Sequence, residues 1–493
     1  MIRMGSARRI SGLLAALAVL YAALMFPDHG TPVQQRAAQK PFAWSQDEFW
    51  AEQEGRFLRA RRADPAAVDA QVALHFRRAE RVLQRLESAD AAPGDSLFAS
   101  LEREFFSAAA LVAARPRHAE RFTALYNRAR VAVKRQSRAW DVASRPARDT
   151  LYRLLYGMRA AVEEVLLQTR DLAFPPAMLV SEAPSAAPAA DILGIKVHSG
   201  DLLVSRGGAE VSALISRGND YPGNFSHVAL VYVDADGGAS YVIESHIERG
   251  VAVASVEQYV RDRKLRFMVL RARADLPRVA LDPLLPHKAA RTAYEEARLR
   301  HIPYDFKMNF HDPAAMFCSE VGSYAYGRHG IELWQGVSTI SSQGVVNWLH
   351  AFGVEHFVTQ MPSDLEYDPQ LAVVAEWRDP QTLLEDHIDN AVMDVLLERA
   401  DAGEELGYSP WRLPVARALK GYCVLRNLMG RECLIPEGMS ATQALKSHTF
   451  TDRHARLARL AEQRVRDFVA AQGYVPPYWQ LVRLAREAEQ QRR

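Results

Sequence analysis

The stretch FSHVALVYVDADGGASYVIESHIERGV, from Phe225 to Val251, holds two short runs rich in β-branched and aromatic residues, His227–Val233 and Tyr241–Ile247. Runs of this length and composition are typical of β-strands. Between them lies the Gly-rich segment DADGGA (Asp234–Ala239), which is typical of a hairpin turn. The stretch therefore predicts two neighbouring antiparallel strands.

The pattern continues on both sides of this hairpin. Asp201–Val204 and Phe267–Leu270 predict two more strands, and Lys288–Arg300 predicts a helix. A second helix is expected around Cys318. Together these elements predict an α+β fold with a small antiparallel sheet and a Cys-bearing helix.

Helical regions are expected on either side of this unit. Asp64 followed by Pro65 is typical of a helix N-cap with proline at the first helical position. Beyond Tyr367 the sequence again has helical periodicity, in Leu383–Arg399, Trp411–Leu428 and Ala455–Ala471. We therefore expect a leader at 1–34, a helical region at 35–174, a Pro/Ala/Ser-rich linker at 175–190, the α+β unit at 191–365 and a C-terminal helical region at 366–493.

The composition excludes several classes of protein. The 493 residues include 61 Lys and Arg against 59 Asp and Glu, and 48% are hydrophobic. A hydrophobic content near one half excludes wholesale disorder. The nearly balanced charge gives no reason to expect a nucleic-acid partner.

The N-terminus predicts export. Arg3, Arg8 and Arg9 precede an uncharged run from Ile10 to Phe26. A basic start followed by a short apolar core is typical of a secretory signal, and the run is also at the short edge of what spans a membrane. A cleaved signal and a retained anchor both remain open, with a buried helix of the fold as the third possibility. In the first two cases the rest of the chain lies in the cell envelope, outside the cytoplasmic membrane.

Three cysteines are too few for a disulfide scaffold, but two of them lie close together. Cys423 and Cys433 form a disulfide candidate, with two buried thiols as the alternative. Cys318 then remains single, either as a small buried residue or as a nucleophile.

Cys318, His227 and Glu244 are the candidate catalytic residues. A cysteine hydrolase needs a thiolate, a base that takes and returns its proton, and a polar group that orients the base. A carboxylate on the strand next to the histidine strand can reach the imidazole. Each residue alone is also compatible with a structural role, although a charged Glu244 inside an apolar strand needs a partner.

A set of short motifs occurs in a fixed order along the chain: GDLL at 200–203, FSHVALV at 225–231, YVIE at 241–244, GV at 250–251, YDF at 304–306 and FCSE at 317–320. In this set the chain resembles the permuted papain-like amidase family, the circularly permuted branch of the NlpC-type cysteine hydrolases. That branch has its histidine strand before its cysteine helix, as this sequence does. The resemblance covers about Ile195–His356 and implies a permuted papain-like core.

The resemblance implies Cys318 as nucleophile, His227 as base and acid, and Glu244 as the orienting group. The residues in supporting positions are Asp201, Tyr304, Asp305, Ser319, Glu320 and His246. For Asp201 a turn cap is the preferred alternative, and His246 shares the strand face of Glu244 and is an alternative third polar group. The oxyanion hole would use the backbone N–H of Cys318 and one further donor.

One local signal conflicts with this site. Asp312 and Pro313 are typical of a helix start, which would place Cys318 in the second turn, where the helix dipole acts weakly. Either Pro313 begins a separate turn, or the thiol depends mainly on His227.

Three functions remain open. The first is an exported cell-envelope cysteine hydrolase that cleaves an amide bond, in a peptidoglycan stem peptide or a related conjugate. The second is a lipid ester or thioester hydrolase or acyltransferase with the same triad, and the third is a non-catalytic envelope scaffold. The expected partners are a peptidoglycan-derived peptide or lipid substrate and the membrane, through the N-terminal segment.

No cofactor or metal is expected. The sequence has no Cys-x-x-Cys or His-Glu-x-x-His spacing. It also has no Gly-rich phosphate loop of the usual type.

Overall fold

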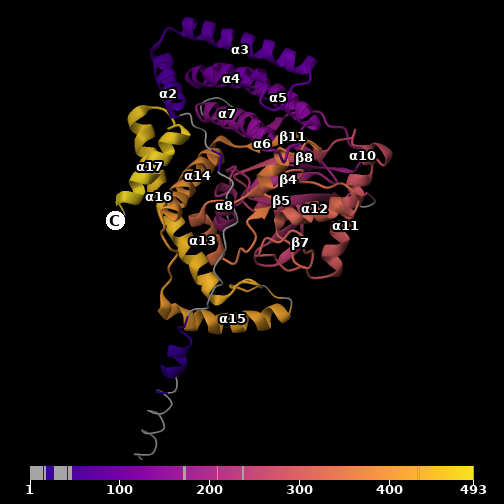
Figure 1. The fold of residues 1–493 in the computed structure, drawn as a ribbon, viewed down its shortest axis with the longest axis vertical. Helices are drawn as coiled ribbons and strands as arrows, with labels where there is room; N and C mark the ends of the chain where they lie inside the picture. Colours follow the sequence, from indigo (N-terminus) through magenta and orange to yellow (C-terminus); the bar gives the residue numbers. More distant parts are fainter. Residues whose placement is uncertain are drawn as a thin grey trace, which may run out of the picture.

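The structure is a computed structural model, and it describes residues 15, 18–26, 41–42, 47–169, 174–207, 209–235, 238–429, 431 and 433–491. Helices surround an antiparallel sheet, so the expected α+β class is confirmed (Figure 1). The predicted leader at 1–34 falls largely outside the described residues. Within the described part of the chain, no helix has the length and apolar character needed to cross a bilayer.

The central sheet has seven strands in the order β1-β11-β8-β4-β5-β6-β7, and every neighbouring pair is antiparallel. Its strands are β1 (Ala177–Leu179), β4 (Leu202–Arg206), β5 (His227–Val233), β6 (Ser240–His246), β7 (Gly250–Ser255), β8 (Arg266–Ala272) and β11 (Leu371–Arg378). Two small sheets pair β2 (Ala189–Ile192) with β3 (Ile195–His198) and β9 (Ser338–Thr339) with β10 (Val358–Thr359).

The sheet extends beyond the α+β unit expected from the sequence. Strand β1 lies inside the segment expected as a linker, and β11 lies past residue 365, in the region expected to be helical. Neither strand is marked by its own sequence, because β1 has only three residues and β11 lies between Pro369 and Pro380. Their place in the sheet depends on pairing partners far away in the sequence, which periodicity does not reveal.

Six helices on the N-terminal side form a stack at one end of the molecule (Figure 1). They are α2 (Asp47–Arg62), α3 (Pro65–Ser88), α4 (Ser96–Ala114), α5 (Ala119–Gln136), α6 (Arg145–Leu151) and α7 (Met158–Leu167). The cap expected for α3 is present, because the N–H of Ala67 donates to Asp64 Oδ2 at 3.1 Å. Helix α5 packs against β11, the strand next to the edge strand β1, so the stack lies at this end of the sheet.

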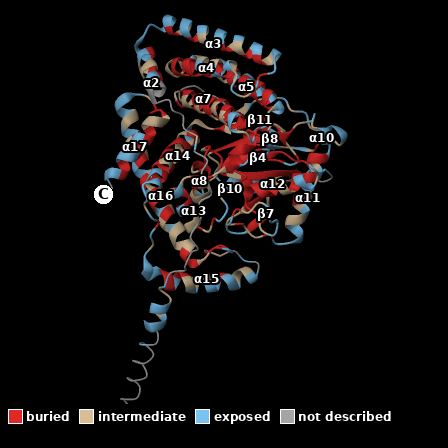
Figure 2. Ribbon diagram, in the orientation of Figure 1, coloured by how far each residue is buried: buried red, intermediate tan, exposed pale blue. Residues whose placement is uncertain are grey.

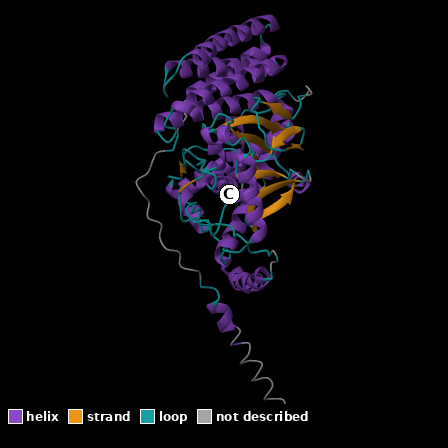
Figure 3. Ribbon diagram, turned by 90° about the vertical axis from the view of Figure 1, so that its right-hand side faces the viewer, coloured by secondary structure: helices purple, strands orange, loops and turns teal. Residues whose placement is uncertain are grey.

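The other helices are α8 (Glu210–Arg217), α9 (Val256–Arg261), α10 (Pro277–Leu281), α11 (Leu285–Leu299), α12 (Cys318–Gly327), α13 (Gln343–Ala351), α14 (Pro380–Asp401), α15 (Leu413–Leu428), α16 (Ala441–Gln472) and α17 (Tyr478–Gln491). The view turned by 90° shows the helical stack, the strands and α15 following one another along the long axis (Figure 3).

The two faces of the sheet have separate cores. Alternate residues such as Val204, Val228 and Leu270 pack against α11 and α12. The intervening residues, such as Leu203 and Val231, pack against the β2–β3 ribbon and α9. This alternation is the strand period of two, and it buries the sheet on both faces (Figure 2).

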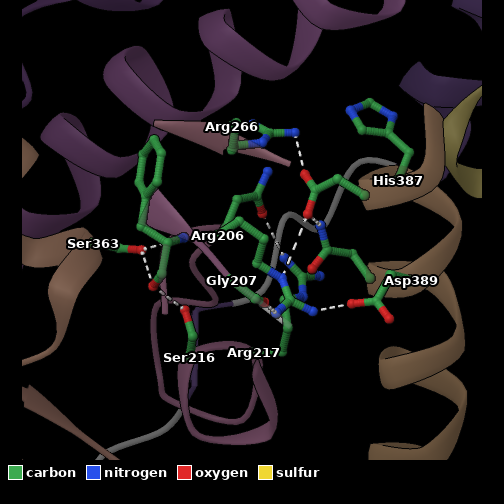
Figure 4. A network of polar contacts seen from close by, with 12 residues as sticks. Arg206, Gly207, Ser216, Arg217, Arg266, Ser363, His387 and Asp389 are labelled. Carbon is green, nitrogen blue, oxygen red and sulfur yellow. Dashed lines mark hydrogen bonds and ion pairs between the residues drawn. The ribbon is translucent and has the colours of Figure 1, made fainter. Parts of the chain in front are cut away.

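A buried ionic network joins the sheet to helices from the N-terminal and C-terminal regions, and Figure 4 shows its part around Arg206, Arg266 and Asp389. Arg266 on β8 donates to Glu163 of α7 at 2.5 Å and pairs with Asp386 of α14. Arg206 on β4 pairs with Asp386 and with Asp389 of the same helix. The N-terminal and C-terminal helices are therefore tied to the sheet by shared charges.

Candidate active site

His227 and Glu244 face each other across two neighbouring strands. In the pairing of β5 with β6, Glu244 lies opposite Ala229, so its side chain is on the same face as His227 and one diagonal step away. The distance between His227 Nε2 and Glu244 Oε2 is 2.7 Å. Glu244 is 2% exposed on its side chain and His227 19%. The hairpin thus places a buried carboxylate on a ring that still reaches the surface.

His246 occupies the other oxygen of the same carboxylate. Its Nε2 lies 3.0 Å from Glu244 Oε1, and its ring centroid is 5.8 Å from that of His227. His246 and His227 therefore contact the two oxygens of one carboxylate, and His246 lies on the strand face expected from the period of two.

Cys318 is the first residue of α12. The preceding Phe317 is extended, with φ −88° and ψ 176°, so the helix does not begin at Pro313. Asp312 instead closes a separate turn, in which its Oδ1 accepts the N–H of Ala314 at 3.1 Å. The conflict in the sequence is thus resolved in favour of a short turn followed by a new helix, and the sulfur lies in the first turn, where the helix dipole favours an anion.

A negative charge on Cys318 and a positive charge on His227 stabilise each other. Burial alone would lower the pKa of His227, but hydrogen bonds to Cys318 and Glu244 and their negative charges raise the pKa to about 9. Burial alone would raise the pKa of the Cys318 thiol, but the hydrogen bond and positive charge of His227 outweigh it and lower the pKa. The arrangement favours a thiolate–imidazolium pair.

Glu244 is held as an anion. Burial would raise its pKa, but hydrogen bonds with His227 and His246 keep the pKa well below its usual range. A permanent negative charge at this position stabilises the imidazolium and fixes the orientation of the ring.

Comparison with known proteins gives a match to this part of the chain. Residues 196–375 match the model of a family described as permuted papain-like amidase enzyme, YaeF/YiiX, C92 family. This segment is therefore similar to the permuted papain-like amidase family. The chain is also similar to a crystal structure of metalloprotein yiiX from Escherichia coli O157:H7, with 19% identity over 37% of this chain and 98% of that chain, and a TM-score of 0.30. No curated protein matches the chain.

The amidase family is one of papain-like cysteine amidases and peptidases, so the expected cysteine hydrolase class is confirmed. The match extends to residue 375 and therefore includes most of β11, which the sequence had not placed in the α+β unit. We call residues 196–375 the amidase domain.

Two contacts in the amidase domain position the segment before Cys318. The hydroxyl of Ser245 donates to the carbonyl of Met316 at 2.6 Å, and the N–H of Met316 donates to the carbonyl of Pro303 at 3.0 Å. Gly250, with φ +72°, lies so close to the Ile302 carbonyl that a Cβ would stand 2.0 Å from that oxygen. The GV motif is thus explained by a close backbone approach, whereas nothing in the sequence singled out Ser245.

Tyr304, Asp305 and Glu320 lie around the cysteine end of the site. Asp305 accepts the N–H groups of Lys307 and Asn309 at 2.8 and 2.5 Å, and so shapes the loop. Burial, followed by the charge of Cys318, raises the pKa of Tyr304 well above its usual value. Tyr304 is therefore a neutral neighbour of the sulfur.

Glu320 accepts the N–H of Phe317 at 2.8 Å through Oε2. Burial and the nearby charges of Asp305 and Cys318 raise the pKa of Glu320 to about 9. At neutral pH its carboxyl is therefore uncharged and does not oppose the thiolate. Ser319 is fully buried in the first turn of α12, and its hydroxyl is a minor contributor to the lowered pKa of Cys318.

Asp201 is built into a turn and an ion pair. Its Oδ2 accepts the N–H of His198 at 2.7 Å, and its two oxygens accept hydrogen bonds from Arg271 at 2.8 and 2.7 Å. None of these contacts involves the triad, so the structure favours the alternative of a turn cap.

Three further residues lie near the His227–Glu244 pair. Ser205 is the strand partner of His227, and the charge of Glu244 acts on both Tyr259 and Lys264. Lys264 lies over the Tyr259 ring, with Nζ 4.4 Å from the centroid, and burial lowers its pKa. Sequence reasoning missed these residues because only the strand pairing and the turn before β8 bring them here.

The remaining candidates concern cysteines and metals. Cys423 and Cys433 form a disulfide that ties the C-terminal half of α15 to the segment after it. Cys318 is a free, buried cysteine. Among the described residues, no group of three or more His, Cys, Asp and Glu side chains is arranged to hold a metal ion.

Proposed function

We propose that the protein is an exported cell-envelope amidase with a Cys318–His227–Glu244 triad in a permuted papain-like core. In this core, strands β5 and β6 carry the base and its orienting carboxylate, and α12 presents the nucleophile. The observation that carries the proposal is the continuous contact from Glu244 through His227 to a sulfur at a helix N-terminus. A buried cysteine with only a packing role would have no such chain of contacts.

The reaction follows from these positions. The Cys318 thiolate attacks the carbonyl carbon of the amide, and the carbonyl oxygen becomes an oxyanion near the Cys318 N–H, which as the first N–H of α12 has no intrahelical acceptor. His227 then gives its proton to the leaving amine nitrogen, the C–N bond breaks, and a thioester remains on Cys318. Water adds to the thioester while His227 takes its proton, the C–S bond breaks, and a carboxylic acid is released, which restores the thiolate–imidazolium pair.

The substrate class we propose is a peptidoglycan stem peptide or a related amide conjugate. Two features support an envelope location: the Arg-flanked uncharged run Ile10–Phe26 and the Cys423–Cys433 disulfide, since disulfides persist in oxidising compartments. The amidase family match supports an amide as the scissile bond.

The triad is tested by the rate at which iodoacetamide alkylates Cys318. In the wild-type protein we expect alkylation at pH 7 to be at least 10-fold faster than that of a model thiol with a pKa near 8.5. His227→Ala should remove this advantage, whereas His301→Ala, a control at a 57% exposed histidine paired with Glu437, should retain it. Equal, slow alkylation of all three proteins would contradict a catalytic triad.

The reaction class is tested with products. Purified muropeptides should yield new free amines with the wild-type protein and none with Cys318→Ala. Free fatty acid from phospholipid vesicles, without amine from muropeptides, would contradict the amidase proposal and favour the lipid hydrolase.

A further inference from the structure

The solvent-facing side of α15 is apolar. The exposed side chains on this side of α15 and of the residues that flank it are Trp411, Val415, Tyr422, Leu425, Leu428 and Met429, which we call the α15 apolar face. Trp411, Val415, Tyr422, Leu425 and Met429 follow helical spacing. The exposed fractions of the six side chains run from 54% for Tyr422 to 80% for Leu428. An apolar stripe that faces solvent marks an interaction surface.

The opposite side of α15 is fixed to the rest of the protein. Leu413, Ala416 and Cys423 are buried, and the disulfide joins Cys423 to Cys433. Lys420 donates to the carbonyl of Pro436 at 2.8 Å. Because this side is held in place, the helix cannot rotate to bury its apolar face within the same chain.

Basic side chains border the apolar face. Arg417 and Arg426 lie on α15, Arg412 directly precedes it, and Leu413–Leu428 contains no Asp or Glu. An apolar face edged by Arg and carrying Trp and Tyr is suited to the boundary between the acyl chains and the headgroups of an anionic bilayer.

The N-terminal apolar run ends against the same helix. Tyr21 donates through its hydroxyl to the carbonyl of Trp411 at 2.5 Å, and Arg417 donates to the carbonyl of Leu24 at 2.8 Å. Val19 and Phe26 are 69% and 73% exposed. In two views residues 18–26 lie beyond α15, on its side away from the sheet (Figures 1 and 3). Helix α15 itself lies across the long axis of the molecule (Figure 1).

We propose that α15 lies in the surface of an anionic lipid bilayer, with the α15 apolar face among the upper acyl chains and its basic side chains at the lipid phosphates. Together with the N-terminal run, this second contact fixes the orientation of the amidase domain above the membrane. The proposal does not depend on the triad.

Bromolipid quenching of Trp411 tests this proposal in the full-length protein. The protein is reconstituted into vesicles of phosphatidylcholine with acyl-brominated chains, with and without phosphatidylglycerol. We expect bromolipids to quench the wild-type emission more than that of Trp411→Phe, by the contribution of one tryptophan in eight. This difference should grow with the phosphatidylglycerol fraction and shrink at high salt.

Paired aspartate variants locate the contact. Leu425→Asp with Leu428→Asp should abolish the quenching assigned to Trp411. Leu281→Asp with Leu299→Asp is a matched control, because these leucines are 88% and 83% exposed on α10 and α11, and it should quench as the wild type does. Both pairs should retain the wild-type rate of Cys318 alkylation, so loss of quenching is separable from loss of the triad.

Two results would overturn the proposal. One is equal quenching of the wild type and Trp411→Phe. The other is a wild-type dimer in detergent that only Leu425→Asp with Leu428→Asp dissociates, without any quenching of Trp411 by bromolipid, since the face would then bind a second copy of the chain.

Discussion

The hydroxyl of Ser245 donates to the carbonyl of Met316 at 2.6 Å. This bond links the strand that carries Glu244 to the segment that ends at Cys318, although the two residues are 71 positions apart. Ser245 is 1% exposed, so no bulk solvent replaces the bond if it is lost. The relative position of the proposed base and the proposed nucleophile thus depends on a residue outside the proposed triad.

Ser245→Ala should therefore lower kcat by about 10-fold or more, because small misplacements of reacting groups are costly. The Met316 carbonyl loses its partner, so the free energy of unfolding should also fall by about 1–3 kcal/mol. Kinetics on an amide substrate and urea unfolding measure the two effects. Ser245→Thr, which keeps the hydroxyl, should restore kcat.

A matched control separates stability from positioning. Ser181 makes the same kind of bond, from its hydroxyl to the carbonyl of Val373 at 2.7 Å, at the β11 side of the sheet. Ser181→Ala should lower stability without changing kcat. If both variants lose kcat equally, Ser245 has no positioning role.

Activity should follow a bell-shaped pH profile. The thiol must be deprotonated, so the acidic limb lies below the ordinary thiol pKa because His227 lowers the pKa of Cys318. The imidazolium must keep its proton to protonate the leaving group, so the basic limb lies at about pH 9, the pKa of His227. The dependence of kcat/KM on pH measures both limbs.

Glu244→Gln should move the basic limb to lower pH. The charge and hydrogen bond of Glu244 help to raise the pKa of His227, so their removal lets burial lower that pKa again. We also expect kcat/KM at pH 7 to fall about 10²-fold, in the range of a positioned acid–base group. Glu248→Gln, at an exposed carboxylate four residues along, should leave both the limb and the rate unchanged. A basic limb that stays at pH 9 in Glu244→Gln would contradict the role of this carboxylate.

Gly250→Ala should destabilise the protein and disturb the site together. Gly94 and Gly250 have similar positive φ values, +83° and +72°, but a Cβ at Gly94 meets nothing within 4 Å, whereas at Gly250 it meets the Ile302 carbonyl. Gly94→Ala should therefore show the backbone strain alone, about 1–2 kcal/mol. Gly250→Ala should exceed this and slow the alkylation of Cys318. Equal losses of stability in urea would show that the close approach to Ile302 has no effect.

Asp386→Asn should test how far the flanking helices are fused to the sheet. Asp386 is fully buried between Arg206 and Arg266, so neutralising it leaves buried guanidinium groups short of a counter-charge. We expect a loss of about 3–5 kcal/mol in the free energy of unfolding. Glu398→Gln, on the same helix in a half-exposed pair with Arg486, should lose less than about 1 kcal/mol. Denaturant unfolding that showed equal, small losses would mean that the network adds little to stability.

The hairpin and the cysteine helix illustrate the limits of sequence reasoning for this fold. The pairing of His227 with Glu244 was predictable, because a tight turn joins their strands and the period of two sets their faces. The start of α12 at Cys318 was not predictable, because Asp312 and Pro313 give an equally good local signal for a helix that begins earlier. Packing decided between them: the Met316 backbone is held by Ser245 and Pro303, and the new helix can begin only after it.

The sequence by itself determined the local elements, the order of the His, Glu and Cys motifs and the family to which they point, because strand alternation and turn chemistry are written in neighbouring residues. Only the tertiary structure decided that β1 and β11 complete the sheet, that Cys318 opens a helix beside His227, and that Asp386 holds two arginines from different strands. These features join residues up to about 200 positions apart. Such contacts depend on which surfaces pack together and which charges pair in the folded chain. Local periodicity in the sequence does not contain that information.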